Sequence, residues 1–190
     1  MKVFRDSPIP LVKSMSSKQA SIVMMGVAGC GKSSLGVAVA KQLGLPLIEG
    51  DNHHSADSLA KMRSGVALTD ADRDGWLTAL GEQLGSQTTA VVLTCSALKR
   101  AYRDRLRSAA PGLCFVYLDI NRSQALARVT ARAAEHFFST SLVDSQFATL
   151  EVPTGEAGVL RVDAMAPLAD LQAQVCACLN TPQSTPKEAA

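Results

Sequence analysis

A short glycine-rich stretch limits what this chain can fold into more than any other feature. Residues 26–33 read GVAGCGKS, which fits the pattern G-x-x-x-x-G-K-[ST] at every fixed position. In such a loop the glycines let the backbone curl so that its N–H groups converge on phosphate oxygens. The lysine adds a mobile positive charge, and the serine offers a hydroxyl to Mg²⁺. A match by chance in a chain of this length has odds of about one in a hundred, so the motif predicts a nucleotide-phosphate site.

The residues assigned to that site are those of the loop and its first neighbour. They are Gly26, Val27, Ala28, Gly29, Cys30, Gly31, Lys32, Ser33 and Ser34. Lys32 is expected to contact the β- and γ-phosphates, and Ser33 is the candidate metal ligand. The helix that follows would present the positive end of its dipole to the same anion.

The pattern around the loop is an alternation of strand-like and helix-like runs. The apolar runs predict strands at Ser21–Met25, Leu47–Glu49, Ala90–Thr94, Cys114–Leu118 and Val159–Val162. Helical patterns cover Lys32–Leu43, Ser55–Ser64, Asp70–Leu84, Lys99–Ser108 and Ser123–Ala133, and a last helix begins near Pro167. Such alternation is typical of α/β domains with a parallel sheet. We predict a three-layer α/β fold with a five-stranded parallel sheet.

The chain is the length of one domain. Its 190 residues fit a single unit of about 100–200 residues, which we place at residues 21–180 between irregular tails at 1–20 and 181–190. Two long stretches, Gly50–Gly85 and Arg132–Thr154, are not needed to build the sheet. Because excursions from a rigid scaffold commonly carry binding sites, we predict a helical substrate-binding excursion at about 51–85 and a lid at about 128–154.

Charge and composition exclude some partners. Nineteen Lys and Arg face seventeen Asp and Glu, which leaves a net charge of +2. That balance gives no broad field for nucleic acid or an acidic membrane, and no apolar run reaches the ~18 residues of a membrane span. Five cysteines without a zinc-binding spacing favour a reduced, cytoplasmic protein. The basic, serine-containing start weakly suggests an organelle address, and an irregular tail is the favoured interpretation.

The loop alone does not distinguish a GTPase, a motor ATPase and a small-molecule kinase. The sequence has no Asn-Lys-x-Asp motif, and the strand at 90–94 ends in Thr94-Cys95-Ser96 without an acid. P-loop NTPases commonly have an acid at the end of such a strand, the Walker-B acid. Asp119, which ends another strand, could take that place, although a solvated acid at a strand end is the simpler interpretation. Asp51 follows the strand Leu47–Glu49 and would face the phosphate loop across the carboxyl edge of the sheet. These features favour a small-molecule kinase.

Further motifs make the resemblance specific. They occur in a fixed order over residues 21–180: Gly50-Asp51-Asn52-His53-His54, Asp70-Ala71-Asp72-Arg73 with Trp76-Leu77, Cys95-Ser96-Ala97-Leu98-Lys99 with Tyr102-Arg103-Asp104, and His136-Phe137-Phe138 with Gln146-Phe147, Thr149-Leu150-Glu151 and Pro153. Together with the phosphate loop, this order resembles the gluconate kinase family of P-loop kinases.

The resemblance implies ATP-dependent phosphorylation of D-gluconate to 6-phospho-D-gluconate, with Mg²⁺, by a homodimer. Lys32, Asp51 and Arg128 would be catalytic, with Asp51 as proton acceptor or orienting group. Arg128 and Arg132 would be lid arginines that contact ATP. The implied substrate contacts are Asp51, His54, Arg73, Ser96, Lys99, Arg103, His136 and Gln146.

Simpler interpretations stay open for several of these residues. Asp51 could cap a helix. Arg128 and Arg132 could be a solvated pair four residues apart on a helix. Lys99 and Arg103 have the same spacing, so they too could lie on a solvated helix face. His136 could be structural, whereas Trp76, Leu77, Leu80 and Leu84 are expected in the core. Alternatives for the whole chain are a kinase for shikimate or a nucleoside monophosphate, and a non-catalytic nucleotide sensor.

Overall fold

The structure, a computed structural model, describes residues 20–132 and 140–180. Its centre is a sheet in the order β2-β3-β1-β4-β5, in which every neighbouring pair of strands is parallel. The strands are β1 Ile22–Met25, β2 Leu47–Glu49, β3 Val92–Thr94, β4 Cys114–Asp119 and β5 Val159–Asp163. Because all five run the same way, their carboxyl ends meet at one edge of the sheet, where open α/β sheets bind ligands.

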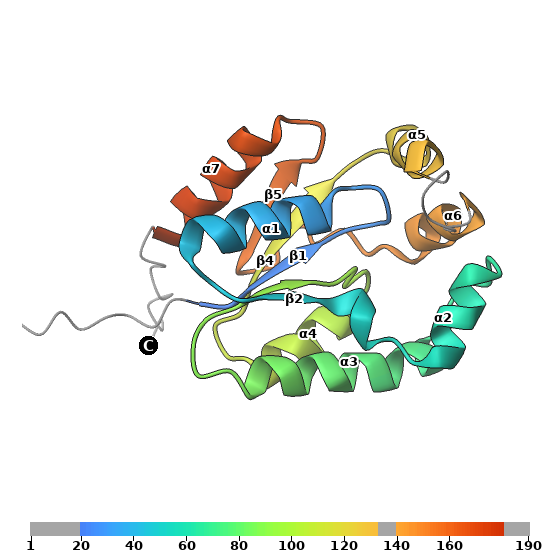
Figure 1. The fold of residues 1–190 in the computed structure, drawn as a ribbon, viewed down its shortest axis with the longest axis horizontal. Coiled ribbons are helices and arrows are strands. Elements are labelled where there is room, and N and C mark those ends of the chain that lie inside the picture. Colours follow the sequence, from blue (N-terminus) through green and yellow to red (C-terminus); the bar gives the residue numbers. More distant parts are fainter. Residues whose placement is uncertain (1–19, 133–139, 181–190) are drawn as a thin grey trace, which may run out of the picture.

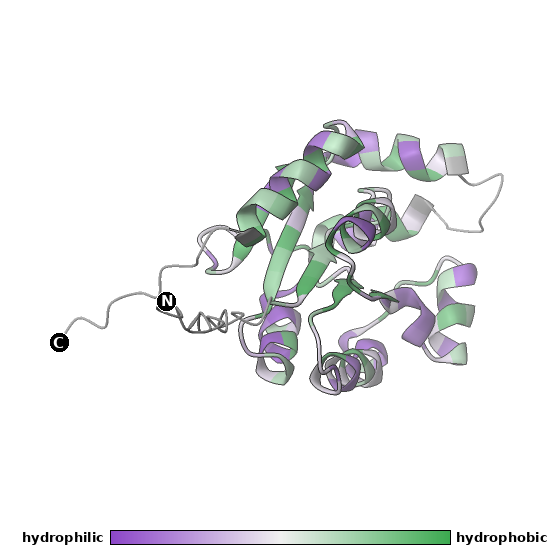
Figure 2. Cartoon of the chain, turned by 60° about the vertical axis from the view of Figure 1, so that its left-hand side comes forward, coloured by the Kyte–Doolittle hydropathy of each residue, from purple (hydrophilic) through white to green (hydrophobic). Residues whose placement is uncertain are grey.

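Burial explains why these apolar runs form the middle of the sheet. Val23 of β1 pairs with Leu93 on one side and Phe115 on the other, and all three side chains are fully buried. Strands covered by helices on both faces have no solvent side, so their apolar residues run continuously without alternation. Figure 2 shows these strands as mostly hydrophobic, between helices that mix hydrophobic and hydrophilic residues.

Helices cover both faces of the sheet and complete three layers (Figure 1). On one face lie α1 Lys32–Leu43 and α7 Leu168–Asn180, which pack against each other. On the other face lie α3 Asp70–Gly85 and α4 Arg100–Ala109, which form a second packed pair. Each face has its own apolar cluster, the first built around Leu35 and the second around Leu80.

Local sequence signals set the ends of two of these helices. Gly44 ends α1 in a left-handed conformation with φ 65°, and its N–H bonds to the last turn, as glycine commonly does after a helix. Thr69 begins α3 through a capping box with Asp72, in which each side chain bonds to the other residue's backbone N–H. Such a box satisfies donors that the first turn of a helix leaves open.

The remaining elements gather at the carboxyl edge of the sheet, on the right in Figure 1. They are the 3₁₀ turn η1 Gly50–His53, α2 Ala56–Arg63, α5 Arg122–Arg132 and α6 Thr140–Thr149. The first two belong to the predicted substrate-binding excursion, and α6 falls within the predicted lid. The fold therefore brings both excursions to the end of the sheet that carries the phosphate loop.

The predicted α/β architecture with five parallel strands is confirmed. The strand predicted at Ala90–Thr94 is shorter in the structure, Val92–Thr94, and the helix predicted at Ser123–Ala133 is Arg122–Arg132. The tails predicted at 1–20 and 181–190 fall almost wholly outside the described residues. Within the described ranges, no helix is long and apolar enough to cross a membrane.

Candidate active site

The phosphate loop turns sharply between β1 and α1 and packs closely against α5. Gly29 has a φ of 80°, and a Cβ added there would lie 2.7 Å from the carbonyl oxygen of Ala125. A side chain at this position is therefore excluded by backbone conformation and by space. The loop's shape depends on a glycine at residue 29, a position that the motif leaves variable.

The charged and hydroxyl groups of the loop have defined partners. The Lys32 Nζ donates to the carbonyl oxygen of Val27 at 3.0 Å, within the loop itself. The Ser33 hydroxyl donates to the Glu49 carboxylate at 3.1 Å, and the Thr94 hydroxyl donates to the same oxygen at 2.6 Å. Glu49 thus links the candidate metal ligand to the carboxyl ends of β2 and β3.

A cavity of about 520 Å³ opens at the loop. Ten residues predicted for the site line it: Ala28, Gly29, Gly31, Lys32, Ser33, Asp51, His54, Arg73, Ser96 and Gln146. Parts of the phosphate loop and the predicted substrate contacts therefore share one space, although they come from segments far apart in the sequence.

Gly50 fixes the turn that carries Asp51 and His54. Its N–H donates to the Thr94 hydroxyl at 3.3 Å, and its carbonyl accepts the indole N–H of Trp76 at 2.7 Å. A Cβ at Gly50 would lie 2.1 Å from the Thr94 carbonyl oxygen, so only glycine allows this approach. The turn is thereby tied to β3 and α3, and the Asp51 side chain remains 81% exposed.

His54 is held beside Asp51. Its ring stacks on Trp76 with centroids 4.3 Å apart and an interplanar angle of 15°. The His54 Nε2 lies 3.9 Å from Asp51 Oδ1, and the side chain is only 5% exposed. Burial lowers the pKa of His54, the Asp51 charge opposes this shift, and the Arg73 charge adds to it.

Arg73 presents a buried positive charge to the same cavity. The residue is 8% exposed, and its guanidinium lies over the Tyr102 ring, 5.9 Å from the centroid. In the part of the chain that the structure describes, no carboxylate lies within ion-pair distance of it. Because buried charges are normally paired, the position of Arg73 indicates a binding site for an anion.

The helix α6 contacts both rims of the cavity. Its Gln146 Oε1 accepts the Ala28 N–H of the phosphate loop at 2.6 Å. Its Ser141 hydroxyl donates to the carbonyl oxygen of Gly65, just after α2, at 3.1 Å. The predicted lid segment therefore connects the phosphate loop to the substrate-binding excursion.

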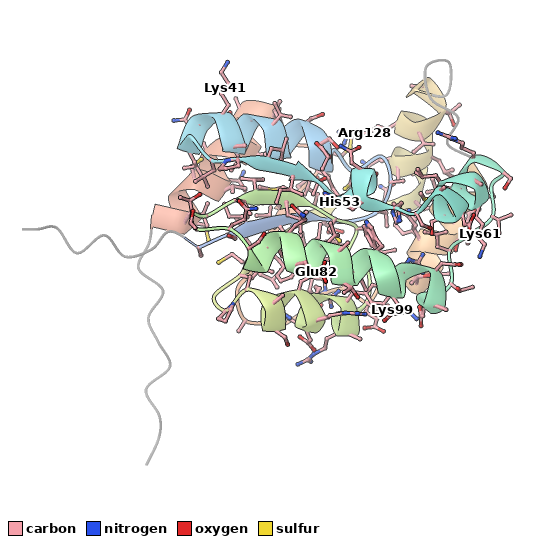
Figure 3. All side chains as sticks on the ribbon, turned by 60° about the horizontal axis from the view of Figure 1, so that its bottom comes forward. Lys41, His53, Lys61, Glu82, Lys99 and Arg128 are labelled. Atoms are coloured by element: carbon pink, nitrogen blue, oxygen red, sulfur yellow. The ribbon has the colours of Figure 1, made fainter. Side chains whose placement is uncertain are left out.

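The predicted lid arginines are only partly described. Arg128 donates to the carbonyl oxygens of Gly29 and Cys30 at 3.5 and 3.3 Å and to that of Ala164 at 2.9 Å. It lies beside the start of α1 (Figure 3) and does not line the cavity. The Arg132 side chain and the whole of His136 lie outside the described residues.

Two predicted substrate contacts, Lys99 and Arg103, are not among the residues that line the cavity, and each pairs with a carboxylate of the protein. Lys99 donates to both carboxylate oxygens of Asp70, at 2.8 and 2.7 Å, raising its own pKa and lowering that of Asp70. Arg103 is fully buried and pairs with Glu156, while its Nη1 donates to the Ala97 carbonyl at 2.9 Å. Both cations act within the scaffold.

Asp119 also has a partner away from the cavity. It accepts hydrogen bonds from Arg161 on β5 and, at 3.1 Å, from the Tyr117 hydroxyl. Burial, with Asp119 beside it, raises the pKa of Tyr117 to about 12. This arrangement agrees with the interpretation of Asp119 as an acid at a strand end.

Sequence reasoning missed part of the cavity wall. The residues not assigned to the site were Met62, Ala67, Leu68, Trp76, Thr94, Val129, Leu142 and Ser145. Trp76 is 4% exposed, so it belongs to the apolar core as predicted and also forms a wall of the cavity. Glu49 entered the sequence analysis only as the last residue of a predicted strand, and its hydrogen bond with Ser33 is seen only in the structure.

The residues at the loop suit a nucleotide with Mg²⁺. Ser33 and Glu49 offer hard oxygen atoms, which Mg²⁺ prefers, and backbone N–H groups at the start of α1 suit phosphates. Among the described residues no cluster of three acidic, histidine or cysteine side chains could hold a metal. In a P-loop site the protein hydroxyl, phosphates and waters share the ion.

Comparisons with known proteins agree with this geometry. Residues 22–153 match the family described as "AAA domain". The gluconokinase of Gluconobacter oxydans (strain 621H) is 42% identical over 151 residues, covering 78% of this chain and 84% of the relative. The thermoresistant gluconokinase of Escherichia coli (strain K12) is 43% identical over 150 residues, covering 77% and 85%. The chain belongs to the gluconokinase family.

Solved structures support the same assignment. A gluconokinase from Sinorhizobium meliloti 1021 is 47% identical, with a TM-score of 0.79 over 85% of this chain and 91% of that one. Shikimate kinase from Aquifex aeolicus is 15% identical, with a TM-score of 0.51 over 84% and 95% of the two chains. The second likeness concerns the fold alone, so the gluconokinase family is favoured over the shikimate alternative.

Proposed function

We propose that this chain is an ATP-dependent gluconokinase, which transfers the γ-phosphoryl group of ATP to the terminal hydroxyl of D-gluconate and forms 6-phospho-D-gluconate. The observation that carries the proposal is Arg73, a buried cation on the wall of the cavity that also contains the phosphate loop. A guanidinium can bind a carboxylate through two parallel hydrogen bonds. A sugar acid supplies that carboxylate and a hydroxyl that can be phosphorylated.

Asp51 is the group that receives the hydroxyl proton or orients the hydroxyl. Its carboxylate is exposed at the cavity and held on the 3₁₀ turn tied to β3. A general base must reach the proton that it accepts, and this turn stands at the carboxyl edge of the sheet opposite the loop. Ser96, which also lines the cavity, adds a hydroxyl for the polyol.

The phosphate groups are assigned to the loop. Backbone N–H groups of Gly29, Gly31 and Lys32 hold the phosphates, and the Lys32 side chain leaves the Val27 carbonyl to neutralise them. When bound at Ser33, Mg²⁺ supplies further charge neutralisation. Glu49 keeps the Ser33 hydroxyl in place by accepting its hydrogen bond.

The lid residues have supporting roles in this proposal. Arg128 braces the phosphate loop through its carbonyl oxygens, and Gln146 braces it through the Ala28 N–H. Arg132 and His136 keep the roles that the family resemblance implies. Arg132 would contact ATP, and His136 would contact the substrate. The same resemblance underlies the proposal that the protein is cytoplasmic and a homodimer. Light scattering of the purified protein tests the dimer.

A coupled assay of ADP release tests the function. Gluconate, other sugar acids, shikimate and nucleoside monophosphates are compared as phosphoryl acceptors, and gluconate alone is expected to give rapid release. Lys32→Ala and Asp51→Asn are expected to reduce turnover by at least about 10²-fold while the circular dichroism spectrum stays unchanged. ATP binding without gluconate-dependent ADP release would favour the nucleotide sensor instead.

A further inference from the structure

Three residues of the sequence motifs form a cluster beside the cavity, and none of them lines it. Asp70 is the first residue of α3, Lys99 immediately precedes α4, and Tyr102 lies in the first turn of α4. The Tyr102 hydroxyl donates to the Asp70 carboxylate, and the Lys99 Nζ donates to both of its oxygens, at 2.8 and 2.7 Å. The cluster thus joins the starts of the two helices, and the phosphoryl transfer proposed above uses none of its members.

The cluster contacts the cavity through Arg73. The Arg73 guanidinium lies over the Tyr102 ring, 5.9 Å from its centroid. Tyr102 is 6% exposed and belongs to the apolar cluster under α3 and α4, so packing holds its ring in place. Arg73, in contrast, lines the cavity. Tyr102 is therefore a fixed support behind a cation of the cavity wall.

A neutral phenol suits this position better than a carboxylate. A carboxylate beside Arg73 would pair with its charge, and less of that charge would remain for a ligand. Burial and the hydrogen bond with Asp70 raise the pKa of Tyr102, against the charge and hydrogen bonding of Arg73. Because the ordinary pKa of tyrosine is already about 10, Tyr102 stays protonated and neutral at pH 7.

Lys99 compensates the charge of the one carboxylate in the cluster. The Lys99 hydrogen bond is the largest cause of the lowered pKa of Asp70, the Tyr102 hydrogen bond comes second, and Arg73 contributes least among the groups that lower it. Since a carboxylate only accepts hydrogen bonds, the Tyr102 proton points to Asp70. The lone pairs of the phenol oxygen and the face of the ring then remain for a cation such as Arg73.

We propose that Tyr102 is a positioning residue, which holds the Arg73 guanidinium toward the cavity, and that Asp70 and Lys99 fix the Tyr102 hydroxyl. This role rests on the proposed function, in which Arg73 binds the carboxylate of the sugar acid. Lys99 then serves substrate binding through Tyr102 and not by touching the substrate.

Such a role affects binding and not the chemical step. The carboxylate bound by Arg73 lies at the opposite end of the sugar acid from the reacting hydroxyl, so their contact is the same in the ground state and in the transition state. Loss of a contact of this kind raises KM and leaves kcat unchanged. A general loss of structure in the cavity would lower kcat and raise the ATP KM as well.

Steady-state kinetics of two Tyr102 variants tests the proposal. Tyr102→Leu removes the ring and the hydroxyl, and it should raise the gluconate KM at least about tenfold, with kcat and the ATP KM within about twofold. Tyr102→Phe keeps the ring and should show a smaller rise, about threefold or more. Tyr117→Phe is the matched control, because Tyr117 is 3% exposed, donates to Asp119 and lies away from Arg73. Its gluconate KM should stay within about twofold of the wild type.

Double-mutant cycles separate positioning from damage to the site. In the Arg73→Met background, Tyr102→Phe should cause no further rise in the gluconate KM, because the group that it positions is gone. Lys99→Met alone should raise that KM about two- to fivefold, and it should cause no further rise once Tyr102→Phe is present. Effects of Lys99→Met and Tyr102→Phe that multiply would instead show direct contact of Lys99 with the substrate.

Calorimetry supplies a readout that does not depend on turnover. Gluconate is titrated into the wild type, Tyr102→Phe and Tyr117→Phe with a non-hydrolysable ATP analogue present. The dissociation constant should rise in Tyr102→Phe alone, by the same factor as the KM. Circular dichroism of each variant confirms that it is folded. If Tyr102→Leu does not fold, Tyr102→Phe and the cycles decide the question.

The outcomes distinguish the role of Tyr102 from the proposed function. A wild type that phosphorylates gluconate, with an unchanged gluconate KM in both folded Tyr102 variants, overturns the positioning role alone. An equal rise with and without Arg73 also overturns it, and a wild-type KM in Tyr102→Phe overturns the part assigned to Asp70 and Lys99. A wild type that does not phosphorylate gluconate overturns the proposed function, and the role of Tyr102 with it.

Discussion

Replacing Arg103 by methionine is expected to destabilise the fold without weakening substrate binding. Arg103 is fully buried, and its partner Glu156 has a side chain 8% exposed. Arg103 also donates to the carbonyl oxygens of Ala97 and Leu98, at 2.9 and 3.1 Å. Methionine would leave a buried carboxylate and two carbonyl groups with fewer partners.

The size of the effect follows from this burial. Removing one partner of a buried ion pair costs about 3–5 kcal/mol. Because Arg107 also pairs with Glu156, at 3.1 Å, we expect the lower end, about 3 kcal/mol, which corresponds to a fall in Tm of about 6–12 °C for a domain of this size. Arg105→Met is the matched control on the same helix, because its pair with Asp74 is exposed, at 38% and 69%. That variant should lose no more than about 1 kcal/mol.

Thermal unfolding followed by circular dichroism measures both variants, and a coupled assay at low temperature measures their gluconate KM. Adding Glu156→Leu to Arg103→Met should recover at least about 1 kcal/mol, since it removes a buried carboxylate that is left with Arg107 as its remaining ion-pair partner. An unchanged Tm together with a gluconate KM raised tenfold or more would refute the structural role of Arg103 and restore it as a substrate contact.

The same pair predicts a dependence on pH. The Arg103 hydrogen bond lowers the pKa of Glu156 below its ordinary 4.5. A carboxyl group whose pKa is lower in the folded state stabilises the fold above its unfolded pKa. This contribution is lost as the pH falls below about 4.5 through the folded value. The difference in Tm between wild type and Arg103→Met should therefore shrink in acid, and a constant difference would contradict the assignment.

Three further variants test the cavity. Arg73→Met should raise the gluconate KM about 10²-fold, since two charge-assisted hydrogen bonds of about 1.5 kcal/mol each are lost. Arg63→Met, at an exposed residue, is the control. An unchanged gluconate KM in Arg73→Met would remove Arg73 from the site. Glu49→Gln should raise the Mg²⁺ concentration for half-maximal rate about tenfold, because the neutral amide holds Ser33 less firmly. The control, Glu82→Gln on the outer side of α3 (Figure 3), should leave that concentration unchanged. Equal Mg²⁺ dependence of the two variants would contradict the role of Glu49. Gly29→Ala should weaken ATP binding in calorimetry at least about tenfold through the clash with α5, and wild-type affinity would show that the loop adapts.

The fold could be predicted because its signals are local. The helix Lys32–Leu43 and the strand Leu47–Glu49 agree with the structure to the residue. Glycine after the helix and a continuous apolar run in a covered strand act through neighbouring residues alone. Family motifs similarly placed Asp51 and Arg73, which the structure brings to one cavity.

The rest of the site depended on contacts between distant segments. Arg73 and Arg103 look alike in the sequence, and only the ion pair with Glu156, 53 residues from Arg103, shows that the second is structural. Glu49 meets Ser33 and the Thr94 hydroxyl because β2 lies beside β3 in the sheet. Local sequence does not determine the order of the strands or the contacts between distant segments. The roles of Arg103 and Glu49 could therefore not be predicted from it.

The most direct test of the central claim is identification of the product. The purified protein is incubated with ATP, Mg²⁺ and gluconate labelled with ¹³C at C6, and the mixture is followed by ¹³C and ³¹P NMR. We predict a phosphomonoester with phosphorus coupled to C6, formed at the rate of ADP release and absent with Lys32→Ala. ADP and inorganic phosphate without a phosphomonoester, or a phosphoryl group on another carbon, would contradict the account.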